Sequence, residues 1–269
     1  MNNSQPVFVG IDVGTSRTKA AILDAAGKLR GHAVYKSGTD LGAAAEICLD
    51  AALAMAASSR KDISFTVSTG YGRKNVAFAN GAKTEISCQG KGCFHAFPRE
   101  ITIIDIGGQD NKIIKLESDG TRSSFKMNRK CAAGTGTFLE EMSARLDIPL
   151  EGMDRLARES RSVVELGSFC TVFSATEVLE RIREGKKVPD IVKGLFLSVI
   201  RRVLEMDSLT ENVVMTGGVV AHNPYLVEMT AKILERSLLV PEHPQLTGAI
   251  GAALYARDTG EAPDQPRNA

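Results

Sequence analysis

Short apolar runs separated by polar, glycine-containing turns fill the first part of the chain, and this pattern is typical of β-strands. We predict strands at residues 7–11, 20–23 and 29–35. The polar segment 24–28 contains Gly27 and predicts a hairpin turn between the second and third strands. A polar loop that begins at Asp12 separates the first two strands.

The same order of apolar and polar segments returns about 90 residues later. An apolar run at 101–104 leads into an Asp-Ile-Gly-Gly loop at 105–108, and predicted strands at 111–116 and 122–126 flank a turn at 118–120. We interpret this recurrence of strand, Asp-Gly loop, strand, turn and strand as an internal repeat.

Helical patterns fill most of the remaining chain. Predicted helices cover 40–58, a segment opening at 85, most of 131–208, 225–237 and a closing segment that begins at 246. Further strands are expected at 63–69, at 213–219 with a terminal glycine turn, and at 238–241. The order predicts an α/β fold, with a polar, disordered tail at 261–269.

Composition narrows the class of protein. With 269 residues, 43% of them hydrophobic, the chain favours two lobes over one. The net charge of +1 gives no indication of a polyanionic partner. Five cysteines without disulfide-framework spacing, no secretory signal and no apolar run of membrane-spanning length favour a reducing cytoplasm.

The two Asp-x-Gly loops have the chemistry of a nucleotide site. Gly14 in the first loop, and Gly107 and Gly108 in the second, allow backbone N–H groups to approach phosphate closely. If the repeats pack as a pseudo-twofold pair, Asp12 and Asp105 face each other across a cleft. A carboxylate pair beside phosphates suits a hydrated Mg²⁺ ion.

Other polar residues of the loops complete the candidate site. Thr15, Ser16 and Lys19 can donate hydrogen bonds to phosphate oxygens. Gln109 or Asp110 can orient an attacking water, and we take Asp12, Asp105 and Gln109 as the candidate catalytic residues. No Walker-type loop is present.

Two phosphate loops followed by a third glycine turn, at 217–218, resemble the acetate/sugar kinase–Hsp70–actin superfamily. The resemblance implies an ATP site between two ribonuclease-H-like lobes, with adenosine contacts at Gly217, Gly218 and Asn223. We expect lobe I to comprise 1–97 and 246–260. Lobe II would comprise 98–245 and carry the adenosine side and the cysteines discussed next.

Two cysteines lie at predicted helix starts, Cys131 just before the loop Gly134–Thr135–Gly136 and Cys170 before the helical pattern from 171. A helix start lowers the pKa of a thiol and holds anions, so this loop suits a thiolate, a phosphate or both. A four-iron cluster needs four thiolates. One chain offers two, and a twofold dimer would supply four.

Five segments make the resemblance narrower: TEIS at 84–87, IDIGGQD at 104–110, NRKCAAGTG at 128–136, SFCTVF at 168–173 and MTGGV at 215–219. Over residues 7–255 the chain resembles the activator ATPases of 2-hydroxyacyl-CoA dehydratases and the related benzoyl-CoA reductase ATPase subunits. The resemblance implies a homodimer bridged by one [4Fe-4S] cluster through Cys131 and Cys170. It also implies ATP-driven delivery of one low-potential electron, received from a ferredoxin or flavodoxin, to a partner protein.

Alternatives remain open at this point. Cys88 and Cys93, near His95, stand where such proteins more usually have histidine and alanine. They are either a second metal site or, as we favour, incidental thiols, and Cys48 is expected to be buried packing. A small-molecule kinase of the same fold and a nucleotide-gated binding module without turnover are the rival functions.

Overall fold

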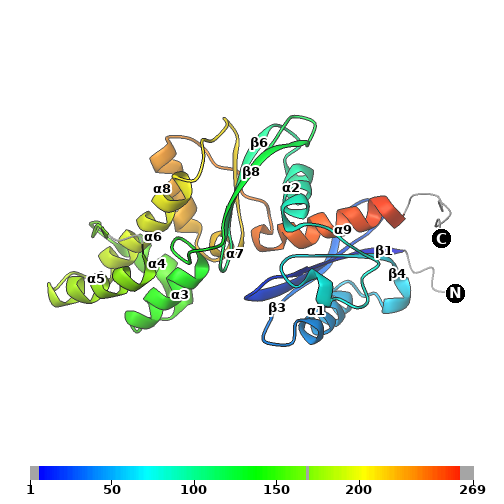
Figure 1. The fold of residues 1–269 in the computed structure, drawn as a ribbon, viewed down its shortest axis with the longest axis horizontal. Helices are drawn as coiled ribbons and strands as arrows, with labels where there is room; N and C mark the ends of the chain where they lie inside the picture. Colours follow the sequence, from blue (N-terminus) through cyan, green and yellow to red (C-terminus); the bar gives the residue numbers. More distant parts are fainter. Residues whose placement is uncertain (1–5, 168–169, 261–269) are drawn as a thin grey trace. The chain divides into compact units, whose positions relative to one another are not determined.

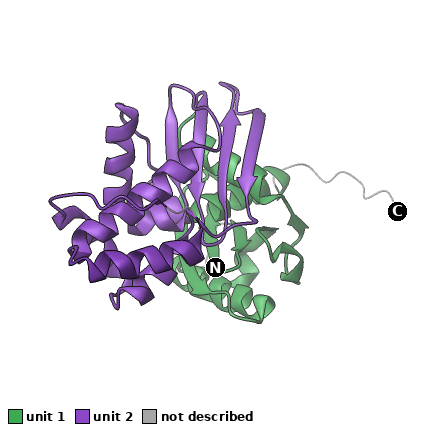
Figure 2. Cartoon of the chain, turned by 60° about the vertical axis from the view of Figure 1, so that its left-hand side comes forward, with its two compact units in different colours: residues 1–98, 246–269 green, residues 99–245 purple. Residues whose placement is uncertain are grey.

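The computed structural model describes residues 6–167 and 170–260. The chain divides into two compact units, residues 1–98 with 246–269 and residues 99–245 (Figure 2). The predicted tail at 261–269 lies outside the described residues.

Unit 1 is built on a five-stranded sheet in the order β3-β2-β1-β4-β5. The strands are β1 (Val7–Val13), β2 (Arg17–Leu23), β3 (Leu29–Lys36), β4 (Ile63–Thr69) and β5 (Gly81–Ala82). Helix α1 (Leu41–Met55) packs on β2 and β3, while α9 (Thr247–Gly260) packs on β1 and β4 and in turn carries α2 (Glu85–Ala96) (Figure 1). Every residue of β1 is buried, because helices cover both faces of this central strand.

Unit 2 contains a four-stranded sheet in the order β8-β7-β6-β9. Its strands are β6 (Ile101–Ile106), β7 (Asn111–Leu116), β8 (Arg122–Asn128) and β9 (Val213–Thr216). The helices are α3 (Gly136–Arg145), α4 (Met153–Glu159), α5 (Thr171–Arg183), α6 (Val188–Leu204), α7 (Gly218–His222) and α8 (Pro224–Leu234). One apolar core joins these helices to β6, β7 and β9.

The register of the two sheets confirms the predicted internal repeat. In unit 1, β1 pairs antiparallel with β2 and parallel with β4, placing Asp12 opposite Lys19 and Thr69. In unit 2, β6 pairs antiparallel with β7 and parallel with β9, placing Asp105 opposite Lys112 and Thr216. Each unit therefore presents one aspartate at the end of its central strand, in the same backbone setting.

Two predicted elements differ from the structure. The strand expected at 213–219 ends at Thr216, because Gly217 has φ +102° and α7 starts at Gly218. The strand expected at 238–241 forms only an isolated bridge from Leu239 to Val214. Pro241 and Pro244 follow closely, and proline lacks the N–H that a continued ladder requires.

Among the described helices, none is both long enough and apolar enough to cross a membrane.

Candidate functional site

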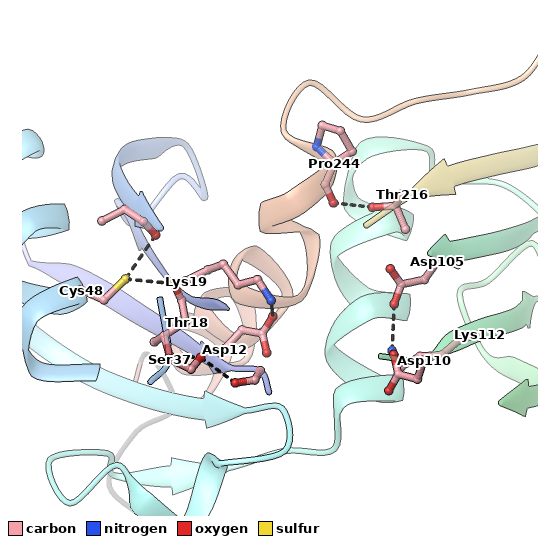
Figure 3. Close-up of polar contacts among 12 residues, drawn as sticks. Asp12, Thr18, Lys19, Ser37, Cys48, Asp105, Asp110, Lys112, Thr216 and Pro244 are labelled. Carbon is pink, nitrogen blue, oxygen red and sulfur yellow. Dashed lines mark hydrogen bonds and ion pairs between the residues drawn. The ribbon is translucent and has the colours of Figure 1, made fainter. Parts of the chain in front are cut away.

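The first loop joins β1 to β2 and is closed by a hydrogen bond from the Gly14 N–H to the Arg17 carbonyl (3.1 Å). Asp12 Oδ2 and Lys19 Nζ lie 3.0 Å apart across the two strands (Figure 3). A Cβ built on Gly14 would lie 3.2 Å from Lys19 Nζ, so the ammonium group stands directly over the loop glycine. Thr15 is exposed and Ser16 half-buried on the same loop.

The surroundings of Asp12 leave one carboxylate oxygen unsatisfied. Gly70 has φ +85°, and a Cβ at this position would lie 2.4 Å from Asp12 Oδ1. Gly248, at the start of α9, packs against Oδ2. Asp12 Oδ1 is buried without a hydrogen-bond partner among the described residues. An orphaned buried carboxylate oxygen fits a cation or the water bound to one.

The second loop repeats this backbone with different charges. Gly107 N–H donates to the Asp110 carbonyl (2.9 Å). Lys112 is 1% exposed, and its Nζ lies 3.1 Å from Asp105 Oδ2 and 2.6 Å from Asp110 Oδ1 (Figure 3). Gly108 is half-buried and Gln109 is exposed at the tip of the loop.

The third glycine turn lies beside Asp105. A Cβ on Gly217 would meet Ile106 O at 2.4 Å and Asp105 Oδ1 at 2.5 Å, so only glycine fits there. Thr216 Oγ1 and the Gly217 N–H both donate to the Pro244 carbonyl, at 2.7 and 3.0 Å. Gly218 begins α7, and the buried Asn223 donates from Nδ2 to the Val219 carbonyl. The structure therefore uses the Asn223 amide group to hold α7.

Hydrogen bonds connect the second loop directly to the start of α3. The N–H groups of Gly136 and Thr137 donate to the carbonyls of Gly107 (2.9 Å) and Gly108 (2.8 Å). Thr137 Oγ1 donates to the Gly108 carbonyl as well. The predicted helix start at 134–135 is confirmed, with Thr135 as N-cap. Any movement of the Gly107–Gly108 backbone must therefore move the first turn of α3.

The same network reaches Cys131. Asn111, fully buried on β7, donates from Nδ2 to the Gly134 carbonyl (2.8 Å). Thr135 donates from its N–H and its hydroxyl to the Ala132 carbonyl. Cys131 is half-buried at the head of this loop. The Cys131 loop is therefore fixed to β7 by a side-chain bond and, through the start of α3, to the second loop by backbone bonds.

Cys170 caps the N-terminus of α5, as the helical pattern predicted, and its side chain is exposed. The following helix presents an apolar face to solvent, consisting of Val172, Phe173, Leu179 and Ile182.

The other three cysteines are buried in unit 1. Burial raises the pKa of the Cys48 thiol from 9.0 to about 12, and that of Cys88 likewise. The prediction that Cys48 is buried packing is confirmed. Cys88 and Cys93 are buried within α2. Among the described residues, no group of three or more His, Cys, Asp or Glu side chains is arranged to hold a metal ion.

Three residues of this site were absent from the sequence-based prediction: Lys112, Asn111 and Gly70. For Lys112 the sequence did contain a signal, the internal repeat. Residues 12–19 and 105–112 align with an offset of 93, and this alignment pairs Lys112 with the predicted Lys19.

The comparisons with known proteins agree with this architecture. The model of the BadF/BadG/BcrA/BcrD ATPase family matches residues 9–256, and the chain belongs to this family. An activator of lactoyl-CoA dehydratase from Anaerotignum propionicum is 41% identical, covering 94% of this chain and 98% of the relative. A subunit of the benzoyl-CoA reductase from Thauera aromatica is 26% identical, over 93% of this chain and 92% of its own length.

Two solved structures are similar over nearly the whole chain. The (R)-2-hydroxyglutaryl-CoA dehydratase component A of Acidaminococcus fermentans has a TM-score of 0.90 with 34% identity, covering 95% of this chain and 99% of that one. The activator of 2-hydroxyisocaproyl-CoA dehydratase from Clostridium difficile, with bound ADPNP, has a TM-score of 0.89 with 38% identity, covering 95% and 96%.

A ROK family glucokinase from Streptomyces griseus has a TM-score of 0.57 with 11% identity, over 94% of this chain and 99% of that one. This likeness shows the fold alone, and the predicted acetate/sugar kinase–Hsp70–actin fold is confirmed.

Proposed function

We propose that the chain is an ATP-hydrolysing activator that passes one low-potential electron to a 2-hydroxyacyl-CoA dehydratase-type partner. The observation that carries the proposal is the hydrogen-bonded connection from Gly107 and Gly108, through the start of α3, to the Cys131 loop. A link between a phosphate loop and a cysteine loop is what coupling of nucleotide turnover to a redox centre requires. The names of the relatives support the class of partner.

ATP binding is assigned to the two repeated loops and the third glycine turn. Gly14, Gly107 and Gly108 carry no side chain and would let the two loops approach the phosphates closely, aided by Thr15, Ser16 and Lys19. Asp12 and Asp105 would hold Mg²⁺ through its waters, and Gln109 would orient the attacking water. Gly134, Thr135 and Gly136 would respond to the phosphates through the second loop. Gly217, Gly218 and Asn223 would form the adenosine turn.

Cys131 and Cys170 fit the ligand set of an iron–sulfur cluster. They are the two cysteines with solvent-accessible side chains, while Cys48, Cys88 and Cys93 are buried. A [4Fe-4S] cluster needs four thiolates, so two copies of the chain would share one cluster on a twofold axis. When bound, the cluster supplies a site that stores one electron at low potential.

The exposed apolar face of α5 supports a homodimer. Val172 is 72% exposed and Phe173 is 68% exposed, immediately after Cys170. Exposed apolar side chains at this density mark an interaction surface. A second copy that shares the cluster would cover this face, because both copies bring α5 to the same axis.

The energetic reason for ATP is the cost of an uphill electron transfer. For one electron, about 59 mV corresponds to ~1.4 kcal/mol, so several hundred millivolts require on the order of ten kcal/mol. ATP turnover is a source of that size. The upstream donor would be a ferredoxin or flavodoxin, and the setting cytoplasmic and anaerobic.

Anaerobic iron and sulfide analysis tests the cluster. We expect about four irons for two chains, a stoichiometry that follows from two thiolates in each copy. The Cys131→Ala variant should lose the iron, and the matched Cys93→Ala variant, which removes a buried thiol of unit 1, should keep it. Full iron in Cys131→Ala would contradict the ligand assignment.

ATP turnover tests the nucleotide part independently. The protein should release phosphate from ATP in the presence of Mg²⁺, and the Asp105→Ala variant should not. The EPR signal of the reduced protein should change when ATP is added. A protein that binds ATP without hydrolysing it would instead be a nucleotide-gated binding module.

The benzoyl-CoA reductase relative favours a second candidate, a permanent ATPase subunit of a reductase complex. Purification from the native source separates the two, because a permanent subunit keeps a fixed stoichiometry with its partners and an activator does not. A small-molecule kinase would transfer the phosphoryl group to an acceptor and contain no iron.

A further inference from the structure

The two repeated loops place their lysines differently, although both lysines pair with the aspartate on the neighbouring strand. Lys19 Nζ stands over Gly14, and the side chain is 17% exposed. The equivalent place over Gly107 is taken by Asp110 Oδ1, which lies 2.8 Å from where a Cβ would be. Lys112 lies behind this carboxylate and is 1% exposed.

The two loops also differ in net charge. In the first loop Asp12 is accompanied by two cations, Arg17 and Lys19. In the second loop the counterpart of Arg17 is Asp110, so two carboxylates share the single cation Lys112. A buried ammonium is stable only when it is paired and hydrogen-bonded, and here both carboxylates meet that requirement.

We propose that Lys112 is a positioning residue for ATP hydrolysis, which holds Asp105 and Asp110 in fixed orientations without touching the nucleotide. This inference rests on the proposed ATPase function. The short contact from Lys112 Nζ to Asp110 Oδ1 (2.6 Å) fixes the carboxylate that stands over Gly107. The contact to Asp105 (3.1 Å) joins that carboxylate to the same cation. Lys19, by contrast, would donate directly to a phosphate oxygen in the proposed ATP site.

The consequence is a division between binding and turnover. The turn Gly107–Asp110 contains Gly107, Gly108 and Gln109, and the buried Lys112 binds its last residue, Asp110. Loss of this cation should displace the reacting geometry, and displacements of this kind reduce the rate of the chemical step by about ten- to a hundredfold. Ground-state binding of the nucleotide is shared with the first loop and the third turn, so it should change less than the rate of the chemical step.

Steady-state ATPase kinetics with Lys112→Met, Lys19→Met and Lys115→Met tests the proposal. Lys112→Met should lower kcat about tenfold or more with KM for ATP within about threefold of wild type. Lys19→Met should instead mainly raise KM. Lys115→Met is the matched control, since Lys115 lies on the same strand and pairs with Asp207 (3.4 Å) away from the loop, and its kinetics should match wild type.

Asp110→Asn provides the second variant, because it removes the negative charge from a side chain that is 26% exposed and keeps an oxygen that can accept a hydrogen bond from Lys112. Its kcat should fall as well. Because Lys112 acts through Asp110, the double variant should be no slower than Lys112→Met alone, within about twofold.

Unchanged kcat in Lys112→Met, or in Asp110→Asn if the former does not fold, would overturn the proposal, as would fully multiplicative losses in the double variant. Wild-type protein without ATPase activity would overturn the proposed function itself, and this inference with it.

Discussion

In unit 1, Thr18 bonds to the Ser37 hydroxyl (3.0 Å), which donates to the Gly14 carbonyl, so the first loop is tied to its own sheet. In unit 2, the counterpart of Thr18 is Asn111, which donates to Gly134 in the Cys131 loop. The cysteines divide in the same way, with three buried thiols in unit 1 and the two accessible ones in unit 2. The same backbone arrangement therefore forms a loop bonded to its own sheet in unit 1, and in unit 2 a loop whose neighbouring strand is bonded to the Cys131 loop.

The largest expected difference between the units comes from removing each aspartate. Asp105→Ala leaves the fully buried Lys112 with one carboxylate fewer, and breaking such a buried pair costs about 3–5 kcal/mol. Asp12→Ala should cost about 1 kcal/mol, because Lys19 is 17% exposed and can reach water. Urea denaturation measures both, and ATP turnover should fall about a hundredfold or more in each.

Asp207→Ala is the matched control for this pair, since it removes a carboxylate of unit 2 that binds Lys115 and Lys126 rather than Lys112. It should leave turnover intact. Equal stability losses in Asp12→Ala and Asp105→Ala would show that the burial of Lys112 does not distinguish the loops.

Substitution of the glycine beside each aspartate should have a similar effect in both units. Gly70→Ala and Gly217→Ala each place a methyl group within 2.4 Å of an oxygen at a positive φ. We expect each to lose about 2 kcal/mol or more of stability and most of its ATP affinity. Thermal unfolding and nucleotide titration measure these effects. A tolerated alanine at only one position would mean that the two turns are not equivalent.

Asn111→Ala should release the Cys131 loop from β7, while the backbone bonds from Gly136 and Thr137 to the second loop remain. The lost bond to Gly134 should cost about 1–3 kcal/mol, since both groups are buried. With full iron and continued ATP hydrolysis, the EPR signal of the variant should respond less to ATP than that of the wild-type protein. Thr18→Val, which breaks the corresponding bond in unit 1, should keep the response. An intact response in Asn111→Ala would contradict coupling through this contact.

The last expected difference concerns the buried thiols of unit 1 and pH. The pKa of Cys48 and of Cys88 is raised by burial from 9.0 to about 12, so the folded state keeps protons that the unfolded state releases. Their contribution is fully present below pH 9.0 and is lost as pH rises toward about 12. Stability, measured by urea denaturation, should therefore fall as the pH rises through this window.

Alkylation of the metal-free native protein gives the companion measurement. Cys131 and Cys170 should react at about pH 8, while the buried Cys48, Cys88 and Cys93 should react only after unfolding. Rapid labelling of Cys88 in the native protein would show that this thiol is accessible, and would contradict the predicted pH dependence.

The local sequence determined much of this protein. Alternating apolar runs and glycine turns defined the repeated strands, because side-chain periodicity and turn chemistry act over a few residues. The same local signals predicted the helix starts at Thr135 and Cys170, which the structure confirms as N-caps. The motifs at 104–110 and 128–136 indicated the family, which the comparisons confirm.

The tertiary structure alone decided which polar residues are partners. The repeat aligns Lys112 with Lys19 in the sequence, but only the pairing of β6 with β7 puts the Lys112 ammonium between two carboxylates. Asn111 contacts Gly134 across 23 positions of the chain for the same reason. The segment 238–241, predicted as a strand, forms only a single bridge, from Leu239 to Val214. Each outcome depends on contacts between distant segments, which short-range periodicity does not encode.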